Sequence, residues 1–208
     1  MTSLQGHASN KITSLVQKKA LLRVKGITLI ELMVSVSISS IVSCIAIPNF
    51  NDFITQVRVD NEISALTRLL FITRNAAINN NSVVTLCPLD NSSKCGSDWQ
   101  QPLSVFTDSN SNAIFEPLKG EHILKSKQPI KQGDKLHYGL GRTNIMFAPT
   151  GHLSGWGKNG TFRYCPQNAK EHNRAIRIAT SGRLYQSTDV NHDGIDELRS
   201  GGKILCRD

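Results

Sequence analysis

The longest apolar run of the sequence is the 21-residue stretch Ile27–Ile47, which contains one charged residue, Glu31. A helix of that length rises about 31 Å, close to the roughly 30 Å thickness of the hydrocarbon core of a bilayer. Elsewhere, no stretch of the sequence approaches 18 apolar residues. The pattern therefore predicts one transmembrane helix, over residues 27–48.

The pattern after Pro48 is that of an amphipathic helix. Residues 49–80 contain neither Pro nor Gly. Apolar side chains recur there at helical spacing in two groups: Phe50, Ile54 and Val57, and then Ile63, Leu66, Leu70 and Ala77. Asn79–Asn81 end the pattern. We therefore expect one helix of about 50 residues, whose amphipathic part, residues 49–81, lies against a sheet.

From residue 82 onward, short runs rich in β-branched and aromatic residues alternate with turn-forming residues, a pattern typical of antiparallel strands. The expected strands are 83–87, 103–106, 122–125, 144–148, 161–165, 175–180 and 184–187, and the expected turns include 90–93, 108–112, 131–134 and 155–160. The predicted class is α+β. We expect the long N-terminal helix to pack on one face of a β-sandwich-like or meandering antiparallel sheet, with residues 82–208 as the β-rich head.

The charge distribution predicts the orientation in the membrane. The net charge of +8 is uneven, with five bases and no acid in residues 1–26, four bases and eight acids in residues 27–118, and fifteen bases and eight acids in residues 119–208. Basic residues remain on the cytoplasmic side of a membrane segment. We therefore expect a single-pass membrane protein with a cytoplasmic N-terminus and a translocated head.

Glu31 bears on what the apolar run is. A secretory signal peptide, a lipoprotein signal ending at Cys44 and a plain membrane anchor are alternatives that fit the run's hydropathy. A charged side chain inside the bilayer costs on the order of 2.5–3.5 kcal/mol, so one that is kept there usually has a partner or a function. Each alternative must therefore explain Glu31.

Residues 25–32, KGITLIEL, resemble the type IV prepilin signature, in which a basic leader ends in Gly and the mature chain has Glu as its fifth residue. The resemblance implies that residues 1–26 are a leader peptide. A prepilin peptidase would cleave after Gly26 and N-methylate Ile27. Ile27 departs from the Phe or Met that is commoner at this position.

The same resemblance implies how the subunit assembles. Glu31 would pair with the new α-ammonium group on Ile27 of a neighbouring subunit, which sets the axial register of a filament. Pro48 lies 21 residues after Ile27, where related pilins have a helix-kinking proline.

Four cysteines follow the apolar run: Cys87, Cys95, Cys165 and Cys206. In an oxidising compartment they predict two disulfides, for which three pairings are possible. We expect Cys87–Cys95, which closes a short polar loop, and Cys165–Cys206, which ties the C-terminus to a strand. A zinc site is not favoured, because the sequence has neither a Cys-x₂-Cys pair nor a nearby His pair.

Segments of the head are similar to the GspH/FimT branch of pseudopilins and minor pilins. They are Val83–Pro88 with Cys95, Asp98 and Trp99, Val105–Asp108 with Asn110, Phe147–Gly151, Gly160–Phe162 with Cys165, and Ser181–Arg183. The resemblance implies a type IV pilin-like fold. It also implies a subunit that joins other pilins at the tip of a type II secretion or type IV pilus filament and helps to initiate assembly. No paired carboxylates, nucleophile motif or phosphate loop suggests an enzyme, and we expect no cofactor.

An alternative function is DNA binding for natural transformation. Some FimT-like members bind DNA through a C-terminal Gly-Arg-x-Arg motif, which Gly182, Arg183 and Tyr185 match except at the second Arg. Other basic residues in this region are Arg174, Arg177, Arg199, Lys203 and Arg207. Such residues neutralise phosphates, and Tyr185 can stack on a base. The same charges would also suit the solvated face of a strand.

A third hypothesis is calcium binding. Asp189, Asn191 and Asp193, followed by Gly194, are spaced like the first half of a calcium loop. The twelfth position, where an EF-hand has Glu, is Ser200 here. An ordinary polar turn explains the spacing equally well.

Overall fold

The computed structural model describes residues 26–155 and 159–206, apart from the side chains of residues 45–49. The leader predicted before Gly26, the side chain of Pro48 and Arg207 therefore lie outside the described residues. The chain divides after Cys44 into two units, residues 1–44 and residues 45–208, and each is described by itself.

Helix α1 runs from Leu29 to Asn79, as the sequence predicted. Thr28, the residue before the helix, caps its N-terminus: its Oγ1 accepts a hydrogen bond from the backbone N–H of Glu31 at 3.3 Å. It ends in a turn where Asn81 has a φ of +48°, a left-handed conformation that asparagine tolerates. Among the described residues, which leave out the side chains of 45–49, none of the helices is both long and apolar enough to cross a bilayer.

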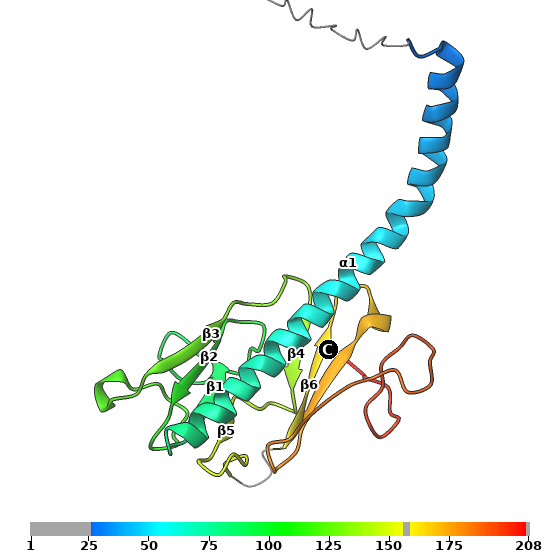
Figure 1. Ribbon diagram of the computed structural model, residues 1–208. Coiled ribbons are helices and arrows are strands. Elements are labelled where there is room, and N and C mark those ends of the chain that lie inside the picture. The colour runs from blue at the N-terminus through cyan, green and yellow to red at the C-terminus, as the bar shows by residue number, and fades with distance from the viewer. Residues whose placement is uncertain (1–25, 156–158, 207–208) are drawn as a thin grey trace, which may run out of the picture. The chain divides into compact units, whose positions relative to one another are not determined.

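Eight strands form two antiparallel four-stranded sheets (Figure 1). The first sheet has the order β3-β2-β1-β5, with β1 at Val84–Pro88, β2 at Leu103–Thr107, β3 at Ile123–Lys127 and β5 at Ile145–Phe147. The second has the order β4-β6-β7-β8, with β4 at Lys135–Tyr138, β6 at Gly160–Cys165, β7 at Arg174–Ile178 and β8 at Leu184–Gln186. Two short 3₁₀ helices, η1 at Pro117–Lys119 and η2 at Lys170–His172, lie in the connections.

The predicted α+β class and the packing of the helix on antiparallel strands are confirmed, and seven of the strands were expected. Strand β4 was missed, because residues 131–134 were taken as a turn and the four residues after them are a short run. Leu136 and Tyr138 are buried, and they pair with Tyr164 and Phe162 of β6. Pairing with a strand distant in the sequence therefore makes this segment a strand.

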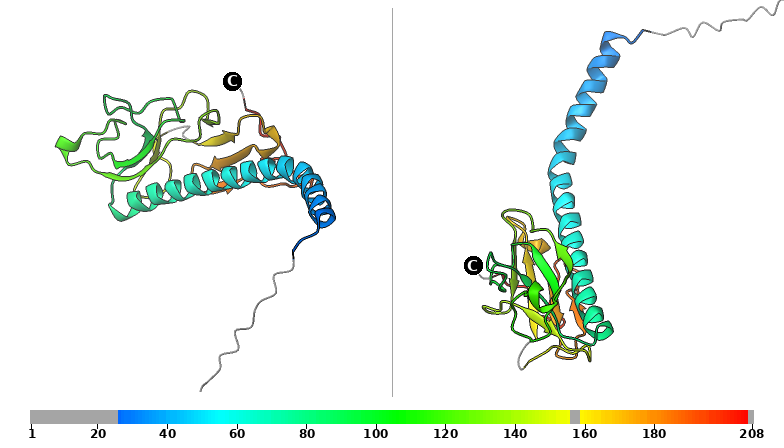
Figure 2. Two further views of the ribbon diagram at one scale, coloured as in Figure 1. Left: turned by 90° about the horizontal axis from the view of Figure 1, so that it is seen from above. Right: turned by 90° about the vertical axis from the view of Figure 1, so that its left-hand side faces the viewer.

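The part of α1 from residue 45 to residue 79 belongs to the second unit and is called its head segment. One hydrophobic core contains side chains from this segment and from both sheets. Figure 2 shows this segment lying along the sheets. The predicted helix positions in the core are buried: Ile63, Leu66, Leu70 and Ala77. The earlier group was placed wrongly against the sheet, since Phe50, Ile54 and Val57 are 61%, 48% and 40% exposed. The buried positions of α1 begin only at Val59.

A buried carboxylate joins the helix to the second sheet. Asp134, whose side chain is 1% exposed, forms an ion pair with Arg58 of α1. The same carboxylate accepts hydrogen bonds from the Tyr164 hydroxyl at 2.6 Å and from the Gln167 backbone N–H at 2.9 Å. Burial raises the pKa of Tyr164 to about 12, so its hydroxyl remains a donor at neutral pH.

Two further ion pairs hold the same stretch of helix. Glu62 pairs with Lys127 of β3 at 2.5 Å. Arg174 of β7 lies 3.5 Å from Asp60 and 3.3 Å from Asp196. Oppositely charged partners from both sheets therefore fix the rotation and register of α1 on the head.

The two disulfides have the predicted pairing, Cys87–Cys95 and Cys165–Cys206. The first closes the loop after β1, and the second ties the end of the described chain to the last residue of β6. Cys44 is the free cysteine of the described part of the chain, and it is exposed.

Two glycines form a close joint between the sheets. Gly182 has a φ of +75°, and a Cβ built on it would overlap the carbonyl oxygen of Gly151. The same oxygen accepts a hydrogen bond from Nε of Arg74 of α1 at 2.9 Å. This joint gives the glycines of segments 147–151 and 181–183 a structural role.

We expect Gly182→Ala to lower the free energy of unfolding by about 2–5 kcal/mol. The left-handed conformation costs a non-glycine residue about 1–2 kcal/mol, and overpacking typically adds 1–3 kcal/mol. The matched control is Gly120→Ala, which has a φ of +82° but no heavy atom within 4 Å of the added Cβ. Urea unfolding of the purified chains measures both, and equal losses in the two variants would contradict the joint.

We expect Asp134→Ala to lower the free energy of unfolding by about 3–5 kcal/mol, because it leaves a partly buried Arg58 without its carboxylate. Lys119→Ala is the control, since it removes an exposed ion pair with Glu116 and should cost less than about 1 kcal/mol. The same denaturation experiment compares them. A loss for Asp134→Ala no larger than the control's would show that the buried pair does not hold the helix.

Candidate functional site

The predicted processing and assembly residues lie at the start of α1. Gly26 and Ile27 are exposed and precede the helix. Glu31 is exposed in the first turn, where the helix dipole favours a negative charge. Thr28 and Glu31 have the spacing of a capping box, and Thr28 Oγ1 accepts a hydrogen bond from the Glu31 backbone N–H, a helix start that the pattern Thr-x-x-Glu signals and that our sequence reasoning missed.

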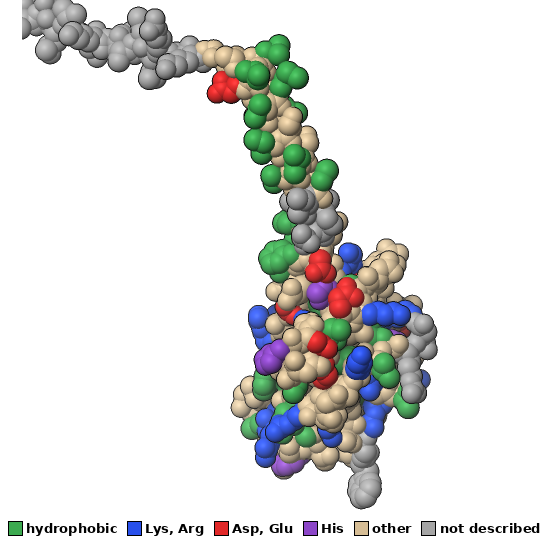
Figure 3. Space-filling model, turned by 90° about the vertical axis from the view of Figure 1, so that its right-hand side faces the viewer, with side chains coloured by type: hydrophobic (Ala, Val, Ile, Leu, Met, Phe, Trp, Pro, Cys, Tyr) green, Lys and Arg blue, Asp and Glu red, His purple; other side chains and the backbone are tan. Residues whose placement is uncertain are grey.

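The first unit of the helix is apolar on its surface. Its large apolar residues are each more than half exposed: Leu29, Ile30, Leu32, Met33, Val34, Val36, Ile38, Ile41 and Val42. Figure 3 shows apolar side chains along this part of the helix. A helix that is apolar all round needs lipid or other helices around it.

The serines of this unit suit an apolar surrounding. Five hydroxyls, those of Ser35, Ser37, Ser39, Ser40 and Ser43, donate hydrogen bonds of 2.7–2.9 Å to backbone carbonyls three or four residues earlier. A hydroxyl that is satisfied within its own helix can be moved into an apolar medium at little cost. The small side chains also allow close approach of a second helix.

A second exposed apolar surface lies on the head segment of α1. It consists of Phe50, Phe53, Ile54 and Val57, each at least 40% exposed. The rings of Phe50 and Phe53 lie 6.5 Å apart. This surface precedes the buried positions of the helix and is available to another subunit.

The residues predicted to bind DNA do not form one group. Arg174 is engaged by Asp60 and Asp196, and its side chain is only 12% exposed, so it has a structural role. Gly182 belongs to the joint with Gly151. Arg177, Arg183 and Lys203 are exposed.

The structure adds Arg163, which is half-buried, to the basic residues of this region. Phe162 and Ile176 pair across β6 and β7 and point into the core, so Arg163 and Arg177 lie on the opposite face of the second sheet. Tyr185 of β8 pairs with Arg177 on that face. The guanidinium of Arg199 stacks 5.0 Å from the centroid of the Tyr185 ring. Sequence reasoning missed Arg163, although its alternation with buried Phe162 and Tyr164 was a signal.

The suspected calcium loop is a turn held by its own backbone. The Asp189 carboxylate accepts hydrogen bonds from the N–H groups of Asp193 at 3.2 Å and Gly194 at 2.9 Å. Asn191 and Asp193 each accept one from the residue two positions later. The hydrogen bond from Gly194 lowers the pKa of Asp189. These bonds are those of a polar turn, the alternative that the sequence left open, and calcium binding stays a prediction.

Two protein families match parts of this sequence. The family described as "Type II transport protein GspH" matches residues 62–182. The "Prokaryotic N-terminal methylation motif" matches residues 21–47. Comparison with curated proteins gives no match.

Solved structures with a similar arrangement are two crystal forms of the type IV minor pilin FimU of Pseudomonas aeruginosa and the minor pseudopilin EpsH of the type 2 secretion system of Vibrio cholerae. The two FimU structures are 17% and 19% identical over 64% of this chain, cover 87% and 92% of their own, and have TM-scores of 0.48 and 0.46. EpsH is 12% identical over 62% of this chain and 95% of its own, with a TM-score of 0.44.

The family match covers more than half of the chain, from the docked part of α1 through β7 to Gly182. It includes the Cys87–Cys95 disulfide and the Gly151–Gly182 joint, and the methylation motif precedes it. The chain therefore belongs to the GspH family of type II transport proteins, as a minor pilin or pseudopilin of a type II secretion or type IV pilus system.

Proposed function

We propose that the chain is a structural subunit that enters the tip of a filament and helps to start its assembly. A prepilin peptidase would first cleave after Gly26 and methylate Ile27. The single observation that carries this proposal is the exposed, largely apolar surface of residues 29–42, whose one charged residue is Glu31. The tip position rests on the resemblance to GspH-like members. No catalytic role is part of the proposal.

The exposed apolar surface of residues 29–42 needs apolar groups around it both before and after assembly. Lipid would cover residues 27–48 while the subunit waits in the inner membrane, and helices of other pilins would cover them in the filament. The five leader bases favour a cytoplasmic N-terminus, and the two disulfides suit a periplasmic head.

When the helices of other pilins replace lipid around residues 27–48, Glu31 would make the specific contact between subunits. Among the described residues it has no ion-pair partner, and its carboxylate is exposed. In an apolar surrounding an unpaired charge is costly, so a cation from another subunit would stabilise it. Cleavage after Gly26 would create such a cation on every subunit, the α-ammonium group of Ile27. In the sequence, Ile27 lies about one helix turn before Glu31.

We expect Glu31→Gln to reduce incorporation of the subunit into filaments at least tenfold, because the amide cannot pair with the ammonium group. Loss of about 1.4 kcal/mol of contact energy suffices for a tenfold change. Quantitative immunoblotting of sheared filaments, normalised to the subunit content of the membrane, measures it. Ser35→Ala is the control on the same helix and should incorporate normally.

Mass analysis of the mature chain accompanies this test. Both variants should begin at methylated Ile27, which shows that a loss of incorporation is a defect of assembly. A mature chain that begins near Ile47 or at an acylated Cys44 would contradict the proposed processing. Normal incorporation of correctly processed Glu31→Gln would contradict the proposed contact.

DNA binding is a second candidate function, favoured by one observation. Arg163 and Arg177 lie on one face of the second sheet beside Tyr185 and its stacked Arg199. Across the described residues, neither Arg163, Arg177 nor Arg183 has an ion-pair partner. Unpaired guanidinium groups on one face can neutralise successive phosphates. The departure from the Gly-Arg-x-Arg motif at Tyr185 would then be offset by Arg163.

We expect the double variant Arg163→Ala/Arg177→Ala to weaken DNA binding and to reduce its salt dependence. Each lost phosphate contact should lower the slope of log K against log salt by about 0.7–0.9. Fluorescence anisotropy with a labelled oligonucleotide at several salt concentrations measures it. Arg68→Ala, an exposed arginine on α1, is the control. Wild-type chain without salt-dependent binding, or equal weakening by the control, would exclude this function.

A further inference from the structure

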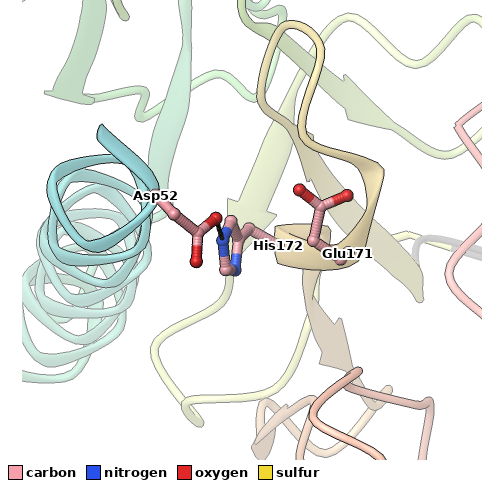
Figure 4. Close-up of side chains that lie close together, drawn as sticks. All are labelled: Asp52, Glu171 and His172. Carbon is pink, nitrogen blue, oxygen red and sulfur yellow. Dashed lines mark hydrogen bonds and ion pairs between the residues drawn. The ribbon is translucent and has the colours of Figure 1, made fainter. Parts of the chain in front are cut away.

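Three potential metal ligands meet between helix α1 and the 3₁₀ helix η2. Asp52 comes from α1, and Glu171 and His172 come from η2 (Figure 4). Nε2 of His172 lies 2.7 Å from Oδ1 of Asp52. One ligand atom from each of the three residues lies within 4.8 Å of the other two. Helix and head thus bring together side chains that are 119 or more positions apart in sequence.

The burial of these groups is unequal. The His172 side chain is 9% exposed, whereas that of Asp52 is 62% exposed, and Glu171 is also exposed. Nδ1 of His172 is buried and has no hydrogen-bond partner. Nε2 is the nitrogen that faces Asp52, and a neutral imidazole that binds an ion through Nε2 carries its proton on Nδ1.

The charges at the cluster also favour a cation. Asp52 and Glu171 are two carboxylates close together, and like charges at this separation repel each other. A protonated His172 could neutralise only one of them. A divalent cation would neutralise both and leave the imidazole neutral, the state in which it binds a metal.

The ligand set indicates which kind of ion fits. Imidazole nitrogen suits zinc and other transition metals, whereas calcium and magnesium prefer oxygen ligands alone. Zinc lies about 2.0–2.1 Å from nitrogen and oxygen ligands, which places tetrahedral ligands roughly 3.4 Å apart. Nε2 of His172 and Oδ1 of Asp52, which are 2.7 Å apart, would therefore need to separate by about 0.7 Å, and ligand atoms as far apart as 4.8 Å would need to close by about 1.4 Å. Water would occupy the fourth position.

We propose that Asp52, Glu171 and His172 bind a divalent transition-metal ion of the zinc class. Such an ion would bond α1 to η2 about two helical turns before Val59, where the buried positions of the helix begin. It would extend the docking of α1 beyond the ion pairs of Arg58, Asp60 and Glu62. The proposal is independent of the function proposed above.

The test is zinc titration of the full-length chain in detergent, purified without a polyhistidine tag and freed of metal by a chelator. All chains carry Cys44→Ser, because a free thiol also binds zinc. Competition with a chromophoric chelator gives the affinity and the stoichiometry. We expect one zinc ion per chain and a rise in the melting temperature when it binds.

The variants separate the site from adventitious binding. His172→Gln and Glu171→Gln should each weaken zinc binding at least tenfold. Glu171→Gln alters an exposed side chain, so it should keep the fold and the melting temperature of the metal-free chain. His122→Gln removes an exposed histidine elsewhere and should bind like the parent.

Three results would overturn the proposal: a parent chain that binds no zinc, binding that survives both site variants, and equal weakening by His122→Gln. Cobalt provides a spectroscopic check, since visible absorption of the cobalt-loaded parent should be absent in His172→Gln. Calcium in equal amount should not displace the zinc, and displacement would contradict the transition-metal class.

Discussion

The head depends on the docking of helix α1 across the two sheets, and the buried carboxylate of Asp134 is central to it. This group lies between Arg58 of the helix and Tyr164 of β6, where its side chain is almost fully buried. Burial of a charge is unfavourable unless charged and hydrogen-bonding partners surround it. Only one rotation of α1 presents Arg58 to Asp134 while Ile63, Leu66 and Leu70 enter the core. Hydrophobic burial therefore supplies most of the stability, and the ion pair restricts the register.

Two parts of the helix differ in what surrounds their apolar side chains. From Val59 to Ala77 its buried side chains belong to the head core. Residues 29–42 are apolar and exposed, and their serines use their hydroxyls within the helix. Such a surface suits exchange between lipid and protein neighbours, because both are apolar. A pilin subunit that assembles with others needs a folded head and a further helical surface for its partners.

The short motifs of the head are mainly structural. Gly151 and Gly182 allow two loops to approach more closely than side chains would permit. Asp108 is buried and accepts hydrogen bonds from Thr85 and from the N–H groups of Asn112 and Ala113, so it shapes the loop after β2. The Asp189 turn uses the same chemistry. Carboxylates that bind backbone N–H groups in this way fix loop conformation without a ligand.

The sequence by itself determined the long helix, the α+β class and seven strands, and it favoured one disulfide pairing among three that the structure then decided. These features follow from local periodicity, turn residues and the spacing of few cysteines, all of which are legible along the chain. Only the tertiary structure decided that Phe50, Ile54 and Val57 are exposed and that Lys135–Tyr138 is a strand. It also decided that Arg174 serves in ion pairs while Arg163 lies on the face of its sheet opposite to the core. It also brought Asp52 to His172. These features depend on contacts between residues far apart in sequence, and no local pattern encodes which distant partners meet.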